Sequence, residues 1–277
     1  MAKKIEMADK SPNHKEEFIK ILESIKPSKN AYEVFADWLV LAAAGFYAWK
    51  KDKLVEKEYK EIAKNYSKED LDKHAQLLAI TVEALEEDDE QDFLGEIFID
   101  GEFRNKKKAQ VFTPFHVSKM MSKMIIGSDN LPKNDVLKIY DPCCGSGVML
   151  IAAISVLRDY GFNYQHNAFF IATDIDARCA RMTYIQLSLL GVPAVIICGN
   201  TLTKETFWER ETIGYIMSGM NFKLRNSEKK KEQKNFKTGE KRKTQRTKKT
   251  NKSDLLNKSE EPKVINPSDD GVQEELF

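Results

Sequence analysis

The first 90 residues carry apolar side chains at the three- and four-residue spacing of helices that bury one face. This spacing predicts helices over about 13–25, 31–51, 54–65 and 68–87. Pro27 ends the first of them, because a proline disfavours the helical conformation in the residue before it. Ser67, followed three residues later by Asp70, is a variant of the capping box that opens a helix. The acidic run 86–92 that closes the block is expected to be a solvated helix end.

From about residue 93 the pattern changes to short apolar runs that alternate with helices. Residues 92–103 mix helix and loop signals, and a helix is expected from about 115 to 126. The predicted strands are 136–140, 168–173 and 194–198 with a short fourth at 213–217, and the helices between them are 148–160 and 177–190. Such alternation forms a mostly parallel sheet with right-handed crossovers. We therefore expect an α/β fold, a partial Rossmann-like sheet preceded by an α-helical N-terminal block.

Charge is distributed unevenly along the chain and helps to divide it. The net charge is +1, yet residues 223–252 hold 14 Lys and Arg against three Glu. After residue 222 the periodic apolar pattern stops, and this composition is typical of disordered chain. The predicted parts are a helical region at 1–92, a ligand-binding α/β domain at 93–222 and a disordered tail at 223–277, first basic and then acidic. A basic block of this kind often binds nucleic acid through phosphates.

Composition excludes several other classes of protein. Four cysteines without paired spacing indicate neither a disulfide scaffold nor a zinc site, so no metal is expected. The N-terminus has no apolar segment of the kind found in signal peptides. The most apolar run, Trp38 to Trp49, is shorter than the roughly 20 residues that cross a bilayer. We therefore expect a cytoplasmic protein that does not enter membranes. The histidines at 14, 74 and 166 are expected on its surface.

The loop between the first predicted strand and its helix is the candidate ligand site. Residues 141–147 read Asp-Pro-Cys-Cys-Gly-Ser-Gly, and ligands of open α/β sheets bind at the carboxyl ends of the strands. Gly145 and Gly147 allow close approach of the backbone, and Asp174, which ends the second strand, can accept hydrogen bonds from a ribose. The loop lacks the signatures of dinucleotide- and phosphate-binding loops. A ligand with a ribose and no phosphate, such as S-adenosylmethionine, fits best. The alternative is a structural turn between strand and helix.

Four motifs in order give a more specific indication. They are Phe-Thr-Pro at 112–114, the loop at 141–147, Asp-Ile-Asp at 174–176 and Gly-Asn-Thr-Leu at 199–202. Together they resemble the motifs of N6-adenine DNA methyltransferases, in particular those of type I restriction-modification modification subunits. The resemblance covers about residues 93–205. It implies a class I methyltransferase fold, S-adenosylmethionine as cofactor, DNA as substrate, and a partner methyltransferase or specificity subunit.

The resemblance also implies which residues surround the cofactor. They are Phe112, Thr113, Pro114, Asp141, Cys144, Gly145, Gly147, Asp174, Ile175 and Asn200. The Phe-Thr-Pro segment would line the methionine end, and the glycine loop would form the pocket for the amino acid and the sulfonium. Asp174 would hold the ribose, and Ile175 would pack on the adenine. Asn200 would contact the adenine amine where the family often has Asp, since an amide oxygen can accept the same hydrogen bond.

The family's catalytic motif is Asn or Asp, then Pro-Pro and an aromatic residue, and the sequence does not contain it. In the family the Asn positions the target amine, and the aromatic residue stacks on the flipped base. Phe222, after the predicted fourth strand, is the candidate for the aromatic residue, but no Asn-Pro-Pro precedes it. The Asn-Pro at 266–267 is interpreted as chance. Only three or four strands are predicted, against about seven in a complete methyltransferase sheet, which fits a split enzyme, a truncated paralogue or a relic.

Three functions remain open on the sequence. The first is an S-adenosylmethionine-dependent DNA adenine-N6 methyltransferase, or a subunit of one. The second is a catalytically inactive accessory protein that binds the cofactor or DNA. The third, a nucleotide-sugar or dinucleotide enzyme, is disfavoured because no phosphate-binding motif is present.

The last five residues form a short motif of a different kind. Gln273, Leu276 and Phe277 resemble the peptide with which bacterial replication and repair proteins bind the sliding clamp. Leu276 and Phe277 would be the apolar anchors, and Gln273 would make the polar contact. A tether of this length would hold the folded part near DNA at raised effective concentration.

A synthetic peptide of residues 266–277 should therefore bind a purified bacterial sliding clamp with a dissociation constant on the order of micromolar. The peptide with Leu276→Ala and Phe277→Ala should lose this binding, because both apolar anchors are removed. Fluorescence anisotropy of the two labelled peptides measures the difference. Equal binding by both peptides would contradict the clamp hypothesis.

Overall fold

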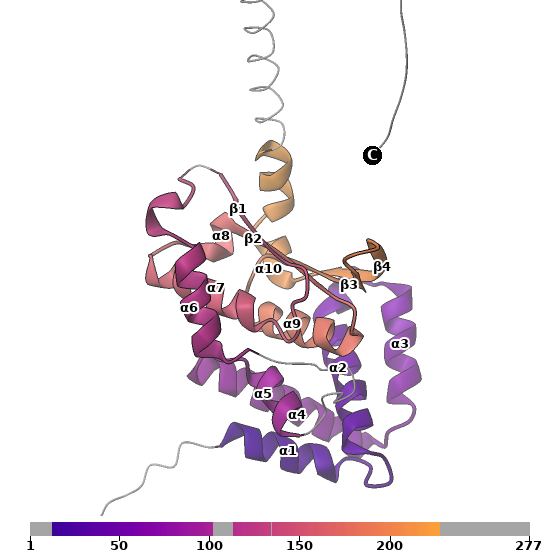
Figure 1. Cartoon of the computed structure of the whole chain (residues 1–277). Helices are drawn as coiled ribbons and strands as arrows, with labels where there is room; N and C mark the ends of the chain where they lie inside the picture. Colours follow the sequence, from indigo (N-terminus) through magenta and orange to yellow (C-terminus); the bar gives the residue numbers. More distant parts are fainter. Residues whose placement is uncertain (1–12, 102–112, 134, 228–277) are drawn as a thin grey trace, which may run out of the picture. The chain divides into compact units, whose positions relative to one another are not determined.

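A block of helices forms the first part of the chain (Figure 1). The computed structural model describes residues 13–101, 113–133 and 135–227, so the predictions made for Phe112 and for Gln273, Leu276 and Phe277 lie outside the described residues. The block contains α1 (His14–Ser24), α2 (Ala31–Tyr47), the short η1 (Ala48–Lys50), α3 (Lys53–Ala63), α4 (Lys68–Glu87) and α5 (Phe93–Asp100). The four helices predicted before residue 90 are confirmed, and the ambiguous segment after residue 93 begins with a helix.

Local capping and aromatic packing explain why this block forms. Ser67 and Asp70 make the predicted capping box, with Ser67 Oγ accepting from the Asp70 amide at 3.1 Å. Phe18 and Trp38 pack edge to face with ring centroids 5.0 Å apart. Phe93 of α5 joins the same cluster through Phe18. These three side chains are fully buried, and large aromatic groups therefore make up the centre of the helical block.

A four-stranded sheet follows, in the order β1-β2-β3-β4. The strands are β1 (Leu137–Asp141), β2 (Ala168–Asp174), β3 (Ala194–Asn200) and β4 (Glu205–Glu211), and the helices around them are α6 (Phe115–Ile125), η3 (Ser128–Asn130), α7 (Val148–Asp159), α8 (Tyr164–Asn167) and α9 (Ala177–Leu189). The first three strands are parallel, and β4 runs antiparallel to β3. The prediction of an α/β fold with a partial Rossmann-like sheet behind a helical block is confirmed.

The predicted fourth strand at 213–217 is wrong, because these residues form the helix α10 (Ile213–Met217). Thr212 caps this helix by accepting from the Tyr215 amide. Gly214 lies so close to the backbone of Gly191 and Val192 that a Cβ would not fit there. The true β4 has the sequence Glu-Thr-Phe-Trp-Glu-Arg-Glu, whose charged residues hide the strand from a search for apolar runs.

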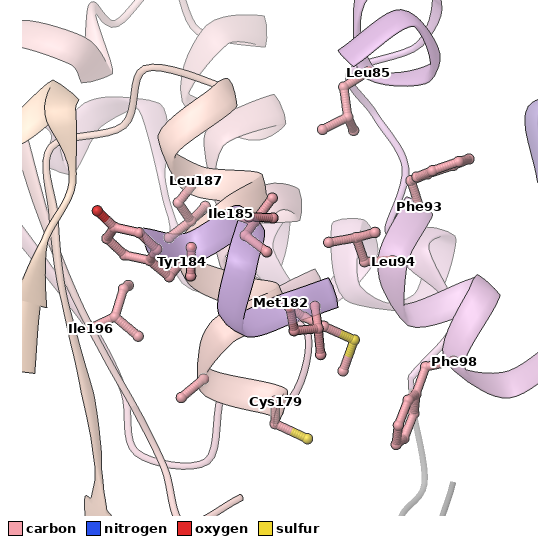
Figure 2. Close-up of a cluster of buried hydrophobic side chains, with 14 of the residues drawn as sticks. Leu85, Phe93, Leu94, Phe98, Cys179, Met182, Tyr184, Ile185, Leu187 and Ile196 are labelled. Carbon is pink, nitrogen blue, oxygen red and sulfur yellow. The ribbon is translucent and has the colours of Figure 1, made fainter. Parts of the chain in front are cut away.

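Helix α9 joins the helical block to the sheet. It packs on β2 and β3, and α2 and α5 pack on it in turn (Figure 1). In Figure 2, Tyr184 of α9 points to the side of the sheet, where Ile196 lies, while Met182 lies on the side of α5 near Leu94. The buried hydrophobic core is therefore continuous from the helical block into the sheet. The division at residue 92 that the sequence predicts does not coincide with a break in this core.

The acidic run 86–92 was expected to be a solvated helix end, and this is wrong for its second half. Arg158 of α7 makes a two-pronged ion pair with Asp89, one arm at 2.9 Å, and also binds Glu90 at 3.0 Å. Glu90 further accepts from Lys119 of α6 at 2.6 Å and from the hydroxyl of Ser155. The ammonium of Lys119 contributes most to lowering the pKa of Glu90, to about 2. These acids attach the helical block to α6 and α7.

The two faces of the sheet are covered unequally. The face packed under α7 and α9 is largely buried and carries Leu137, Ile139, Ala168, Phe170, Ala172, Ala194 and Ile196. On the opposite face, Lys138 and Tyr140 are exposed, and Ile171, Val195 and Ile197 are partly exposed. Tyr215 of α10 covers Phe169 there. Parallel strands are usually buried on both faces, so the described part of the chain leaves a sheet surface open.

Residues 220–227 continue as helix beyond α10, five residues past the point where the sequence places the start of the tail. Lys223 donates to the carbonyl of His166 at 2.7 Å, and Ser227 donates to Asp135 at 2.6 Å. Both contacts lie just before β2 and β1, at the amino ends of these strands. Among the described helices, none combines the length and the apolar character needed to cross a membrane.

His74 is buried in the helical block, contrary to the expectation of a surface position. It is 5% exposed, packs against the ring of Tyr66, and neither ring nitrogen has a hydrogen-bond partner in the described structure. Burial lowers the pKa of His74 from 6.5 to about 4. The native protein therefore keeps His74 neutral at pH values where the unfolded chain already protonates it.

The free energy of unfolding should thus decrease as the pH falls from about 6.5 to about 4, by about 1–3 kcal/mol through this group. His74→Leu removes the titrating group and should lose that part of the pH dependence, whereas His166→Leu, at an exposed position, should keep it. Urea unfolding at pH 7 and pH 5 measures the difference. A His74→Leu protein with the wild-type pH dependence would contradict the assignment.

Candidate functional site

The loop of residues 141–147 connects β1 to α7 and is held by the ends of the neighbouring strands. The Asp141 carboxylate accepts from the Cys143 amide at 3.0 Å, which turns the chain out of β1. The Cys144 amide donates to the carbonyl of Thr173 in β2 at 2.9 Å. The Gly145 amide donates to the Asp174 carboxylate at 2.8 Å. The two predicted acids therefore fix the loop at the carboxyl ends of β1 and β2.

Glycine is required at two positions of this loop. Gly145 and Gly147 have φ of 57° and 101°, in the left-handed region that other residues adopt at a cost. Gly147 also packs against Thr183 of α9, where a Cβ would lie 3.2 Å from the side chain. The Thr183 hydroxyl donates to the carbonyl of Gly145 at 2.9 Å. Thr183 thus supports the loop from the next helix, a role that no sequence motif indicated.

A pocket of about 510 Å³ lies in front of the loop, a size that suits a small-molecule ligand. Its lining contains the predicted residues Thr113, Cys144, Gly145, Asp174, Ile175 and Asn200, together with neighbours that include Cys143, Val148, Met149 and Leu202. Residues from four separate segments of the chain thus meet at one place.

Three of the predicted residues, Pro114, Asp141 and Gly147, do not line this pocket but lie next to residues that do. Gly147 starts α7, and the carbonyl of Pro114 accepts from the first turn of α6. Asp141 lines a neighbouring groove instead. Asn200 uses its side-chain oxygen to accept from the amides of Leu202 and Thr203 at 3.0 and 3.3 Å. Its contact with an adenine amine stays a prediction.

The electrostatics of the pocket favour a ligand that carries positive charge. Burial is the main cause that raises the pKa of Asp141 and of Asp174, and the charge of Asp141 adds to the effect at Asp174. No Lys or Arg is among the described residues that line the pocket. A phosphate would find no cationic partner there, whereas a sulfonium or ammonium group would be stabilised by Asp174 in the lining and by Asp141 beside the pocket. Burial also raises the pKa of the Cys144 thiol, which keeps it protonated and unreactive.

The structure does not bring Phe222 to this pocket. Phe222 is 71% exposed and lies in the helical stretch whose neighbours Lys223 and Ser227 contact the amino ends of the strands. The pocket is at the carboxyl ends, so Phe222 lies at the opposite end of the sheet. No group of three His, Cys, Asp or Glu within the described ranges is arranged to hold a metal ion.

Comparison with known proteins identifies the family to which this fold and pocket belong. The family model described as N-6 DNA methylase matches residues 89–256, more than half of the chain. A search of the curated proteins gives no match.

Two solved structures are similar at low identity. One is a Listeria monocytogenes protein described as a candidate class I S-adenosylmethionine-dependent methyltransferase, at 16% identity and a TM-score of 0.40, with 66% of this chain and 52% of that chain covered. The other is the type I restriction-modification system methyltransferase subunit from Streptococcus thermophilus, at 15% identity and a TM-score of 0.31, with 65% and 55% covered. The chain thus spans about half the length of the solved structures it matches.

The position of Asp174 leads to a test of the pocket. Replacing it by Ala removes the carboxylate that faces the pocket and should weaken the binding of S-adenosylmethionine by about 1–3 kcal/mol, the usual cost of a lost charged hydrogen bond. Isothermal titration calorimetry on the wild type and on Asp174→Ala measures the change. Asp159→Ala, which removes an acid at the far end of α7, is the control and should bind as the wild type does. Equal affinity of all three proteins would remove Asp174 from the site.

Proposed function

Because this chain belongs to the N-6 DNA methylase family, we propose that it is the cofactor-binding part of an S-adenosylmethionine-dependent DNA adenine-N6 methyltransferase. The observation that carries the proposal is the pocket of about 510 Å³ at the glycine loop, with the partly buried carboxyl group of Asp174 in its lining, that of Asp141 beside it, and no lining Lys or Arg among the described residues. S-adenosylmethionine would supply the methyl group that is transferred to adenine. The protein would carry out this work in the cytoplasm.

Different residues of the pocket would contact different parts of S-adenosylmethionine. Asp174 holds the ribose hydroxyls, since each carboxylate oxygen that already accepts one backbone amide retains a second lone pair. Asp174 in the lining and Asp141 beside the pocket would stabilise the positive charge at the reactive end of the ligand. Ile175, which is exposed at the rim of the pocket, offers an apolar surface to the adenine ring. Thr113 closes the methionine end at the start of α6.

The group that would position the target amine comes from a second polypeptide in this proposal. The sequence has no Asn-Pro-Pro, and β1 is the end strand of the described sheet, with no strand on its other side. A groove of about 490 Å³ runs beside β1 between α6 and α7, lined by apolar residues such as Ile126, Ile139 and Leu150. Pro142 lines this groove and the cofactor pocket alike. A strand added to β1 would therefore end beside the cofactor.

The outer face of α6 supports an interaction with a partner subunit. Its residues Val117, Met120, Met121 and Met124 recur at helical spacing, and all are exposed. Met124 is 79% exposed and Ile125, which also lines the groove, is 76% exposed. A contiguous apolar patch of this kind marks an interaction surface, and methionine side chains adapt to the shape of a partner. The bacterial sliding clamp would be a further partner, bound through Gln273, Leu276 and Phe277.

The isolated chain should accordingly bind S-adenosylmethionine but transfer little or no methyl group to DNA. Transfer of tritium from labelled cofactor to adenine-rich DNA measures this. Adding a partner polypeptide that carries Asn-Pro-Pro-aromatic should restore turnover, and Asp174→Ala in the reconstituted complex should reduce it, because the cofactor is bound more weakly.

Different results separate the alternatives. Robust turnover by the isolated chain would show that the amine-positioning group is present in it and would contradict the need for a partner. Cofactor binding without turnover in any reconstituted complex would favour a catalytically inactive accessory protein. No binding at millimolar cofactor would contradict both functions.

A further inference from the structure

A fully buried carboxylate lies directly behind the cofactor loop. Asp92, which caps α5, is 4% exposed and accepts from the hydroxyl of Ser146 in the loop. Its other oxygen accepts from the side-chain amide of Gln186 in α9 at 2.9 Å and from the Gly95 amide at 3.1 Å. The carboxylate thus has three donors, which come from three elements far apart in the sequence.

Gln186 completes the connection between these elements. Its amide nitrogen also donates to the carbonyl of Ser146 at 2.9 Å, and its oxygen accepts from the Leu94 amide at 3.1 Å. Ser146, Gln186 and Thr183 are all buried. Both the side chain and the carbonyl of Ser146 are therefore fixed, one residue before Gly147 turns the chain into α7.

The packing between Asp92 and the loop is tight at Gly95. A Cβ at position 95 would overlap the Asp92 carboxylate and the Ser146 hydroxyl, so only glycine fits there. The helical start of α5 is therefore shaped around the contact between Asp92 and the loop. This closeness distinguishes Asp92 from Asp89, whose ion pair with Arg158 lies at the surface.

We infer that Asp92 is a positioning residue for the cofactor pocket, which holds the Ser146–Gly147 segment of the loop in its ligand-binding conformation from the helical block. The inference rests on the proposed function in that the ligand is S-adenosylmethionine. Asp92 does not line the pocket, so it acts through Ser146. The pocket is then coupled to the helical block, and a disturbance at the start of α5 changes cofactor affinity without touching the cofactor.

Calorimetry with S-adenosylmethionine on single variants of the full chain tests this inference. Ser146→Ala removes the loop's hydroxyl and should weaken binding by about tenfold. Asp92→Ala should weaken it at least as much, whereas Asp92→Asn should recover most of the affinity, since an amide nitrogen can donate to the Ser146 hydroxyl. Asp89→Ala, which breaks an ion pair in the same segment, is the matched control and should bind as the wild type does.

The double variant Asp92→Ala/Ser146→Ala separates positioning from a general loss of stability. If Asp92 acts through Ser146, the double variant should bind cofactor no more weakly than Asp92→Ala alone. Additive losses, or a loss of affinity in Asp89→Ala equal to that in Ser146→Ala, would overturn the inference. Ser146→Ala keeps the test decisive if Asp92→Ala does not fold, since wild-type affinity in Ser146→Ala would also overturn it.

The conformation of the loop can be followed without any ligand. Cys144 is 3% exposed next to Ser146, while Cys143 is exposed. In a Cys143→Ser background, iodoacetamide should alkylate Cys144 at least about tenfold faster in Ser146→Ala than in its parent, because the loop opens more often. The rate at Cys179, buried in α9, should not change.

An unchanged rate at Cys144 would overturn the positioning role even if the cofactor binds. A faster rate at Cys144 in a protein that binds no S-adenosylmethionine would support the positioning of the loop while contradicting the proposed function. Peptide mapping by mass spectrometry resolves the two cysteines.

Discussion

The arrangement of the candidate site depends on how one tight loop is held between strand and helix. A loop with two glycines in the left-handed region has little stability of its own, because glycine loses the most conformational freedom on folding. Its conformation is set from outside, by Asp174 at the end of β2, by Thr183 in α9 and by Asp92 at the start of α5. The helical block is thus part of the site, although none of the helices α1 to α5 lines the pocket.

The same acids contribute to both binding and folding. Asp174 and Asp141 are kept partly buried where a cationic ligand would approach, and their raised pKa values express the unfavourable burial of charge without a cationic partner. Glu90, by contrast, has basic partners in α6 and α7, and its pKa is lowered. Glu90 therefore attaches the helical block to α6 and α7 through cations, while Asp174 lines the pocket, where a cationic ligand would compensate its charge. The raised pKa of Asp174, set against the lowered pKa of Glu90, marks the pocket as a ligand site more clearly than the pocket volume does.

The open surfaces of the sheet are the second structural constraint. In the described part of the chain, β1 has a neighbour on one side only. The face that carries Tyr140, which is 54% exposed, is covered only in part, by α10 at Phe169. Since parallel sheets are normally covered on both faces, these surfaces and the exposed methionines of α6 agree with a protein that works in an assembly. The edge of β1 and the pocket meet at Pro142, so an assembly at this edge would act directly on the site.

The sequence determined what depends on local pattern. Helical spacing fixed the helices of the first block, and β1, β2 and β3 followed from short apolar runs. The glycine loop and Asp174 were placed by their positions at strand ends, since parallel strands bring these ends together. The strand β4 could not be predicted, because it is largely exposed, carries four charged residues and is held by its pairing with β3. The roles of Asp92, Thr183 and Gln186, and the position of Phe222 away from the pocket, were decided by tertiary structure alone. Hydrogen bonds between residues up to 94 positions apart leave no periodic signal in a single sequence.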